Sequence, residues 1–117
     1  MIYIIDDDEI MCECIKNACG HNTEVLVFSN AIEAMSKIDE KKLPSLIFLD
    51  ILLDGPDGFT FLNELLSYSD TEKIPVVIVT SLNVGDTNLS EYGVVGVLNK
   101  DTMTPEEILS YVKEYAN

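Results

Sequence analysis

The sequence predicts an α/β fold in which five parallel strands form one doubly wound sheet between two layers of helices. Short apolar runs rich in Ile, Val, Leu and Phe recur along the chain, and stretches with helical spacing of apolar residues separate them. The runs are nearly continuous instead of alternating with polar residues, which is typical of strands covered on both faces and therefore of a parallel sheet. The expected strands are residues 2–5, 25–28, 45–50, 75–80 and 96–99.

The segments between these runs carry helix start signals, so the expected order is five successive βα units, or (βα)5. Short polar side chains that can cap a helix stand before three of the segments: Ser29 or Asn30, Asp57 and Thr104. Glu107 lies three residues after Thr104 and completes a capping box, with a proline at the first helical position. The stretch 81–93 contains Gly85 and few periodic apolar residues, so its helix is expected to be short or frayed.

Length and charge limit the classes of function. The 117 residues suit one domain over 1–117, and 7 Lys plus Arg against 21 Asp plus Glu give a net charge of −14. Such a charge repels phosphate backbones and anionic lipids, so we expect no direct binding to nucleic acid or membranes. The N-terminus lacks the features of a signal peptide, and no apolar stretch is long enough to span a membrane.

Three cysteines lie within eight positions, and no second cluster of Cys or His completes a zinc site. They are typical of reduced thiols in a cytoplasmic protein. If residues 9–19 form a helix, Cys12 and Cys19 share one face and Cys14 lies elsewhere, which favours packing over chemistry.

Polar residues of a specific mix follow the expected strands, where doubly wound sheets bind their ligands. In strand order they are Asp6 and Asp7, then Asp50, then Thr80 and Ser81, and finally Lys100. Converging carboxylates form an oxygen-rich site suited to Mg²⁺. A lysine and a hydroxyl beside them could hold the oxygens of a phosphoryl group.

On these residues the chain resembles, over its whole length, the receiver domain of bacterial two-component response regulators, in a stand-alone form similar to chemotaxis regulators. The matching motifs are IIDDDE, LIFLDILLDGPDG, PVVIVTS and GVVGVLNK, in the order and near the spacing of the family. The resemblance implies the flavodoxin-like receiver topology.

The resemblance also implies a role for each residue. Asp50 would accept a phosphoryl group from a phosphohistidine of a histidine kinase or phosphotransfer protein. Asp6 and Asp7 would hold Mg²⁺ together with Asp50 and the backbone carbonyl of Leu52. Thr80 and Lys100 would bind phosphoryl oxygens, and the resulting conformational shift would control a downstream protein effector. Of the two paired acids, Asp7 is expected to contact Mg²⁺ directly, while Asp8 and Glu9 suit the first turn of a helix.

Several positions depart from the family pattern. Asp101 follows Lys100 where the family has a proline, often in a cis bond, and Val97 stands where the family has an aromatic switch residue. Leu52 and Leu82 are apolar and cannot orient an attacking water, so we expect slow autodephosphorylation. Gly58, at a common glycine position, is interpreted as a requirement of the turn.

Two other functions compete with this phosphoacceptor switch. The first is a receiver-fold interaction module that works without phosphate, which the departures at Val97 and Asp101 favour. The second is a magnesium-dependent phosphatase with an aspartyl nucleophile, but that class needs an acid where Leu52 stands. A nucleotide-binding domain is disfavoured because no glycine-rich phosphate loop follows the first strand.

Overall fold

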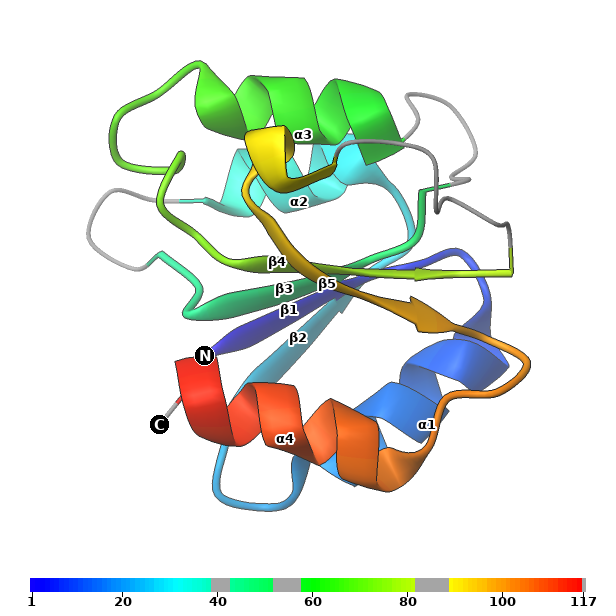
Figure 1. Ribbon diagram of the computed structural model, residues 1–117. Coiled ribbons are helices and arrows are strands. Elements are labelled where there is room, and N and C mark those ends of the chain that lie inside the picture. The colour runs from blue at the N-terminus through cyan, green and yellow to red at the C-terminus, as the bar shows by residue number, and fades with distance from the viewer. Residues whose placement is uncertain (39–42, 52–57, 82–88, 117) are drawn as a thin grey trace.

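The fold was obtained as a computed structural model, which describes residues 1–38, 43–51, 58–81 and 89–116 (Figure 1). Five parallel strands form one sheet in the order β2-β1-β3-β4-β5. Their bounds are β1 Ile2–Ile5, β2 Val25–Phe28, β3 Leu46–Leu49, β4 Val76–Thr80 and β5 Val94–Asn99. Since the chain turns from β2 back past β1 to β3, the strand order switches beside β1.

Helices cover both faces of this sheet, as Figure 1 shows. Their bounds are α1 Glu9–Cys19, α2 Ala31–Lys37, α3 Gly58–Leu66, the 3-10 turn η1 Leu89–Tyr92, and α4 Pro105–Tyr115. One apolar core lies between the sheet and α2, α3 and η1, and a second lies between the sheet and α1 and α4. The predicted α/β architecture with a five-stranded parallel sheet is therefore confirmed.

The predicted element boundaries agree closely with the structure. β1 and β2 have the predicted bounds, and β5 starts two residues earlier, at Val94. Asn30 caps α2 by accepting the Glu33 N–H at 2.9 Å, and Thr104 with Glu107 forms the predicted capping box of α4. The predicted cap Asp57 lies outside the described residues.

The helix expected between β4 and β5 is, in its described part, the single 3-10 turn η1. Residues 82–88, on which the prediction of a short or frayed helix also falls, lie outside the described residues. The cysteine prediction is also confirmed, because α1 buries Cys12 and Cys19 and exposes Cys14.

The expectation that all five strands are covered on both faces is wrong for the two edge strands. Every residue of β1, β3 and β4 is buried, whereas β2 and β5 each contain exposed apolar side chains. Leu26 and Val27 of β2 and Val95 and Val97 of β5 are 37%, 45%, 39% and 42% exposed. An edge strand has a neighbour on one side, so a continuous apolar run does not guarantee full burial.

Candidate functional site

The predicted polar residues converge at the carboxyl end of the sheet. The residues in question, called here the strand-end site, are Asp6, Asp7, Asp50, Thr80 and Lys100. Three of them are almost fully buried: Asp6 is 3%, Asp50 5% and Thr80 1% exposed. Buried polar side chains at the end of a sheet cost free energy unless they are paired, so their gathering indicates a site.

Backbone hydrogen bonds that extend the strand ladders hold these residues in place. The Asp6 N–H donates to the Phe28 carbonyl at 3.0 Å, and the Asp50 N–H donates to the Ile5 carbonyl at 2.9 Å. Each acid therefore continues a rigid strand by one residue, and its side chain is directed by the sheet. The two acids follow neighbouring strands, β1 and β3, which pair in register.

Lys100 brings a positive charge to both buried acids. Its Nζ lies 3.0 Å from Oδ2 of Asp6 and donates a 3.1 Å hydrogen bond to Oδ2 of Asp50. Burial alone would lower the pKa of Lys100, but the hydrogen bonds and charges of Asp6 and Asp50 outweigh burial and raise the pKa above its ordinary value of 10.5. Lys100 is therefore a fully charged ammonium group at neutral pH.

Asp6 is less well satisfied than its partner lysine. Its Oδ1 accepts the Asp8 N–H at 2.9 Å, while its buried Oδ2 has the ion pair with Lys100 but no well-oriented hydrogen bond among the described residues. Burial raises the pKa of Asp6 above 3.8, although the Asp8 N–H and Lys100 both lower it. A buried carboxylate oxygen of this kind is suited to a further cation.

The four consecutive acids at residues 6–9 divide as predicted between the strand end and a helix start. Asp8 is the N-cap of α1, and its Oδ1 accepts the N–H groups of Ile10 and Met11 at 3.0 and 3.2 Å. Glu9 lies in the first turn of α1, where negative charge suits the helix dipole. Asp7 is exposed and stands beside the buried Asp6.

The three aspartates of the strand-end site fit a hard divalent cation. One carboxylate oxygen from each of Asp6, Asp7 and Asp50 lies within 4.8 Å of the other two. In an octahedral Mg²⁺ site with bonds of about 2.1 Å, adjacent ligands are about 3 Å apart and opposite ligands about 4.2 Å apart, so the three oxygens would move closer together on binding one ion. Asp6 and Asp50 are buried and Asp7 is exposed, which leaves an open side for water or a phosphate oxygen. The predicted fourth ligand, the carbonyl of Leu52, lies outside the described residues.

Thr80 ends β4 beside the residue that carries the ammonium group. The backbone N–H of Lys100 donates to the Thr80 carbonyl at 3.0 Å, so the ends of β4 and β5 are joined at the site. Ser81, which follows Thr80, is exposed.

Gly58 permits a close approach of α3 to the residues after β3. A Cβ at position 58 would lie 2.6 Å from the Ile51 Cα and 3.0 Å from the Asp50 carbonyl oxygen. The Gly58 N–H also donates to the Ile51 carbonyl at 2.9 Å. The interpretation of Gly58 as a requirement of the turn is therefore corrected: its φ is not positive, and the close packing against Ile51 and Asp50 is what excludes a side chain.

The structure describes two of the positions that depart from the family pattern, Asp101 and Val97. The described residues contain no cis peptide bond, so Lys100 and Asp101 are joined in the trans form. Val97 is 42% exposed on β5 and has no ring.

Two residues lie next to the site without having been predicted there from the sequence, in which Cys12 was expected only to pack. The Cys12 thiol donates to the Asp6 carbonyl at 3.4 Å, and burial, with the charges of Asp6 and Asp8, raises its pKa to about 11. Cys12 is thus a neutral thiol that packs behind the strand end. Asn99 precedes Lys100 and accepts the Asp101 N–H at 2.7 Å, and an Asn at the start of a loop is a recognised turn signal that could have identified it.

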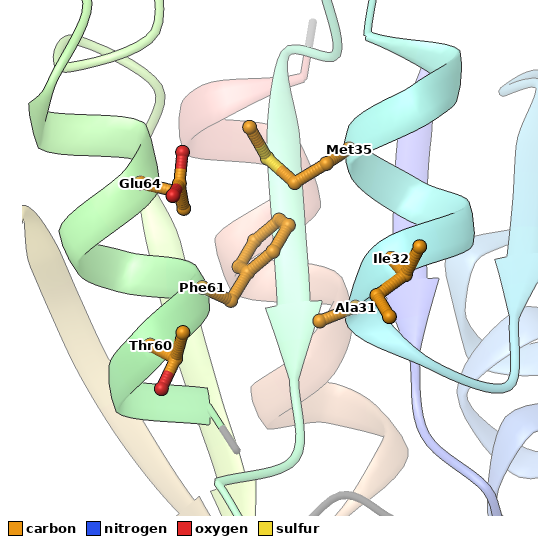
Figure 2. A pocket seen from close by; sticks show the side chains of 6 residues that line it. All are labelled: Ala31, Ile32, Met35, Thr60, Phe61 and Glu64. Atoms are coloured by element: carbon orange, nitrogen blue, oxygen red, sulfur yellow. The ribbon is translucent and has the colours of Figure 1, made fainter. Parts of the chain in front are cut away.

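A separate hollow of about 250 Å³ lies between α2 and α3, and Figure 2 shows its lining. The lining residues are Ala31, Ile32, Met35, Thr60, Phe61 and Glu64. Glu64 is the one ionisable side chain in this lining, so the hollow lacks the clustered acids and the lysine of the strand-end site.

Comparison with known proteins points to one family. The sequence model described as the response regulator receiver domain matches residues 2–113. Among solved structures, a putative response regulator from Chloroflexus aurantiacus is 29% identical, has a TM-score of 0.82, and is matched over 97% of this chain and 93% of that one. A receiver domain protein from Methanospirillum hungatei has a TM-score of 0.81 at 23% identity, covering 97% of this chain and 90% of that one.

Curated relatives are longer proteins. A probable transcriptional regulator from Porphyra purpurea is 26% identical over 96% of this chain, which spans 54% of its length. A protein-glutamate methylesterase/protein-glutamine glutaminase from Oleidesulfovibrio alaskensis is 25% identical over 92% of this chain, which spans 31% of its length. In the part of this chain that the structure describes, none of the helices has the length and apolar character needed to cross a membrane.

Proposed function

Since the chain belongs to the response regulator receiver domain family, as the match over residues 2–113 shows, we propose that it is a phosphoacceptor switch with Asp50 as the acceptor. Residues 1–117 would act as one receiver domain in a cytoplasmic two-component or phosphorelay pathway. The observation that carries the proposal is the ammonium group of Lys100 within 3.1 Å of both Asp6 and Asp50, at the end of a sheet where three carboxylates meet.

In the proposed reaction a carboxylate oxygen of Asp50 bonds to the phosphorus of a phosphohistidine on the partner protein. The P–N bond breaks, and its electron pair stays with the imidazole nitrogen, so the product on this chain is an acyl phosphate. Asp50 suits this task because it continues β3 and is held there by the Ile5 carbonyl, which fixes the direction of approach.

The chain's cationic group offsets the charge of the transferred phosphoryl group. Lys100 already contacts Asp50, so its ammonium group lies beside the position that a phosphoryl oxygen would take. Asp6, Asp7 and Asp50 would hold Mg²⁺, which when bound neutralises charge on the phosphoryl oxygens. Asp6 would serve mainly to orient Lys100 and bind the cation, because its buried Oδ2 contacts the lysine.

Thr80 would read the phosphorylated state. Thr80 is the last residue of β4, and its carbonyl accepts the Lys100 N–H, so a movement of the backbone of either residue would be transmitted to the other. A hydrogen bond from Thr80 to a phosphoryl oxygen would bias the segment after β4 toward a second conformation. A histidine kinase or phosphotransfer protein would supply the phosphoryl group, and a downstream protein would recognise the shifted surface.

Incubation with a small phosphodonor and Mg²⁺, followed by intact mass measurement, tests the proposal. Wild type should gain the mass of one phosphoryl group, and Asp50→Ala should gain none. Asp70→Ala, which removes an exposed acid away from the site, is the matched control and should behave as wild type. No added mass on wild type, or equal addition to wild type and Asp50→Ala, would reject Asp50 as the acceptor.

One observation favours a second candidate, a receiver-fold interaction module that works without phosphate. Val97 is exposed on β5 and lacks the ring that the family uses to couple the site to its surface. This candidate predicts that a binding partner has the same affinity for the phosphorylated and unphosphorylated protein, whereas the switch predicts a difference.

A further inference from the structure

Hydrogen bonds hold the backbone of Lys100 on both of its sides. The peptide before it is fixed because the Lys100 N–H donates to the Thr80 carbonyl at 3.0 Å. The peptide after it is fixed by a side chain, since Oδ1 of Asn99 accepts the Asp101 N–H at 2.7 Å. The two peptide planes that flank a residue set its φ and ψ, and these set where its side chain starts.

The turn that contains Lys100 is built around Asn99. The Asn99 carbonyl accepts the N–H groups of Thr102 at 3.2 Å and Met103 at 2.8 Å, in addition to the bond that its side chain makes. Met103 packs against the core between the sheet, α1 and α4, so the far end of the turn is also anchored. An Asn side chain that bonds the backbone two residues later mimics a backbone turn. Asn99 therefore organises three of the four peptides that follow it.

The geometry of this turn affects where the ammonium group of Lys100 lies. Lys100 Nζ lies 3.0 Å from Asp6 and 3.1 Å from Asp50, so it contacts two acids on two different strands at once. A lysine has four rotatable side-chain bonds, and freedom in the backbone would add to the states in which one of the contacts is lost. β5 is an edge strand, so neighbouring strands do not enclose the end that carries Lys100.

We propose that Asn99 is a positioning residue for Lys100: its side-chain oxygen holds the peptide that follows the lysine and thereby keeps the ammonium group between the carboxylates of Asp6 and Asp50. The inference rests on the proposed function for its consequence, which is the rate of phosphoryl transfer to Asp50. Its structural part, the placement of Lys100, stands apart from that function and is measurable without phosphate or Mg²⁺.

The test combines Asn99→Ala with substitutions of the residue that supplies the donor. Asn99→Ala removes the acceptor, and we expect phosphorylation of Asp50 by a small phosphodonor to slow by about threefold to tenfold, the range of one neutral hydrogen bond. Asn99→Ser keeps a weaker side-chain acceptor and should restore part of the rate. Equal rates for wild type and Asn99→Ala would overturn the proposal.

Asp101→Pro removes the N–H that Asn99 binds, so Asn99→Ala should cause no further loss in that background. Asp101→Ala is the matched control, because it removes the same side chain and keeps the N–H; there Asn99→Ala should slow the reaction as it does in wild type. Equal losses in the two backgrounds would show that Asn99 acts through something other than this bond.

The second readout is the side-chain ammonium signal of Lys100 in Mg²⁺-free protein, followed by NMR. In wild type and in Asn99→Ser we expect a slowly exchanging signal typical of a paired lysine, and in Asn99→Ala a signal broadened by exchange with water. An unchanged signal in Asn99→Ala would overturn the proposal. If wild type itself accepts no phosphoryl group, the proposed function fails, and the NMR comparison still decides the role of Asn99.

Discussion

The centre and the edges of the sheet differ in burial and in the groups that they contribute to the site. The central strands β1, β3 and β4 are buried throughout, and two of them lead directly into the nearly buried acids Asp6 and Asp50. The edge strand β5 has alternating exposure and leads into Lys100, whose side chain is 15% exposed. The acids are thus fixed by the core, and the cation reaches them from the less enclosed edge.

This difference suits the proposed phosphoryl transfer, in which the site would rearrange around the transferred group. Buried carboxylates on rigid strands would keep the proposed acceptor Asp50 in one place, and Lys100, in the turn after β5, would exchange a carboxylate partner for a phosphoryl oxygen. The same arrangement makes the placement of Lys100 depend on local hydrogen bonds, because less packing restrains it.

Truncating a side chain in a central strand should cost much more stability than truncating one in an edge strand. Ile47 of β3 is 0% exposed and pairs with β1 and β4, so Ile47→Ala should lower the free energy of unfolding by about 2–5 kcal/mol. Val97 of β5 is 42% exposed, and Val97→Ala should change the free energy of unfolding by about 0.5 kcal/mol or less. Urea denaturation of both variants measures the two values. Similar losses would mean that β5 is as enclosed as β3.

Mg²⁺ should stabilise the protein through the acids of the centre. At a Mg²⁺ concentration of about 100 times the dissociation constant, the expected gain is about 2.7 kcal/mol, seen as a higher melting temperature. Asp7→Asn should remove most of this gain, because it weakens the cluster of Asp6, Asp7 and Asp50. Asp101→Asn removes an acid from the turn after β5 and is the matched control, in which the gain from Mg²⁺ should be retained. An unchanged melting temperature of wild type on adding Mg²⁺ would count against the metal site.

The centre and the edge should both lose stability as pH rises, but in different pH windows, with the smallest effects of the series. The raised pKa of Asp6 means that, between 3.8 and that pKa, the folded state keeps a proton that the unfolded state has lost. Stability therefore falls as pH rises through this window, and the cost persists at higher pH. Lys100, whose pKa is also raised, contributes stability that is complete below 10.5 and is lost as pH rises through the folded pKa.

Urea denaturation of Mg²⁺-free protein across pH, with Asp6→Asn and Lys100→Met beside wild type, separates the two contributions. Relative to Asp6→Asn, wild type should lose stability as pH rises from 3.8. Relative to Lys100→Met, it should lose stability above pH 10.5. A gain over Asp6→Asn in the acid window would show that Lys100 lowers the pKa of Asp6 by more than burial raises it.

The sequence was sufficient to predict the features that repeat along the chain or carry a strong local signal. The apolar runs located all five strands, and Thr104 with Glu107 identified the start of α4, because these signals depend on nearest neighbours and on burial of a regular face. The fold brings four predicted polar residues to one site, as expected from their places at the ends of parallel strands: Asp6, Asp50, Thr80 and Lys100.

Other features depend on contacts between distant segments and could not be predicted. The apolar composition of β5 did not indicate its exposure, since the order of strands decides which of them is an edge. The need for Gly58 arises from the approach of α3 to Ile51, and the sequence alone does not give that distance. The bond between Asn99 and Asp101 is local, but its importance follows from the two ion pairs of Lys100.

In the proposed function, Asp50 carries the phosphoryl group, and the other acids gathered at the strand ends do not. Phosphorylation with a small phosphodonor and Mg²⁺, followed by borohydride reduction, converts an aspartyl phosphate to homoserine, and peptide mass spectrometry locates the converted residue. We expect homoserine at position 50, with Asp6, Asp7 and Asp8 unchanged. Homoserine at position 6, 7 or 8 with Asp50 intact would contradict it.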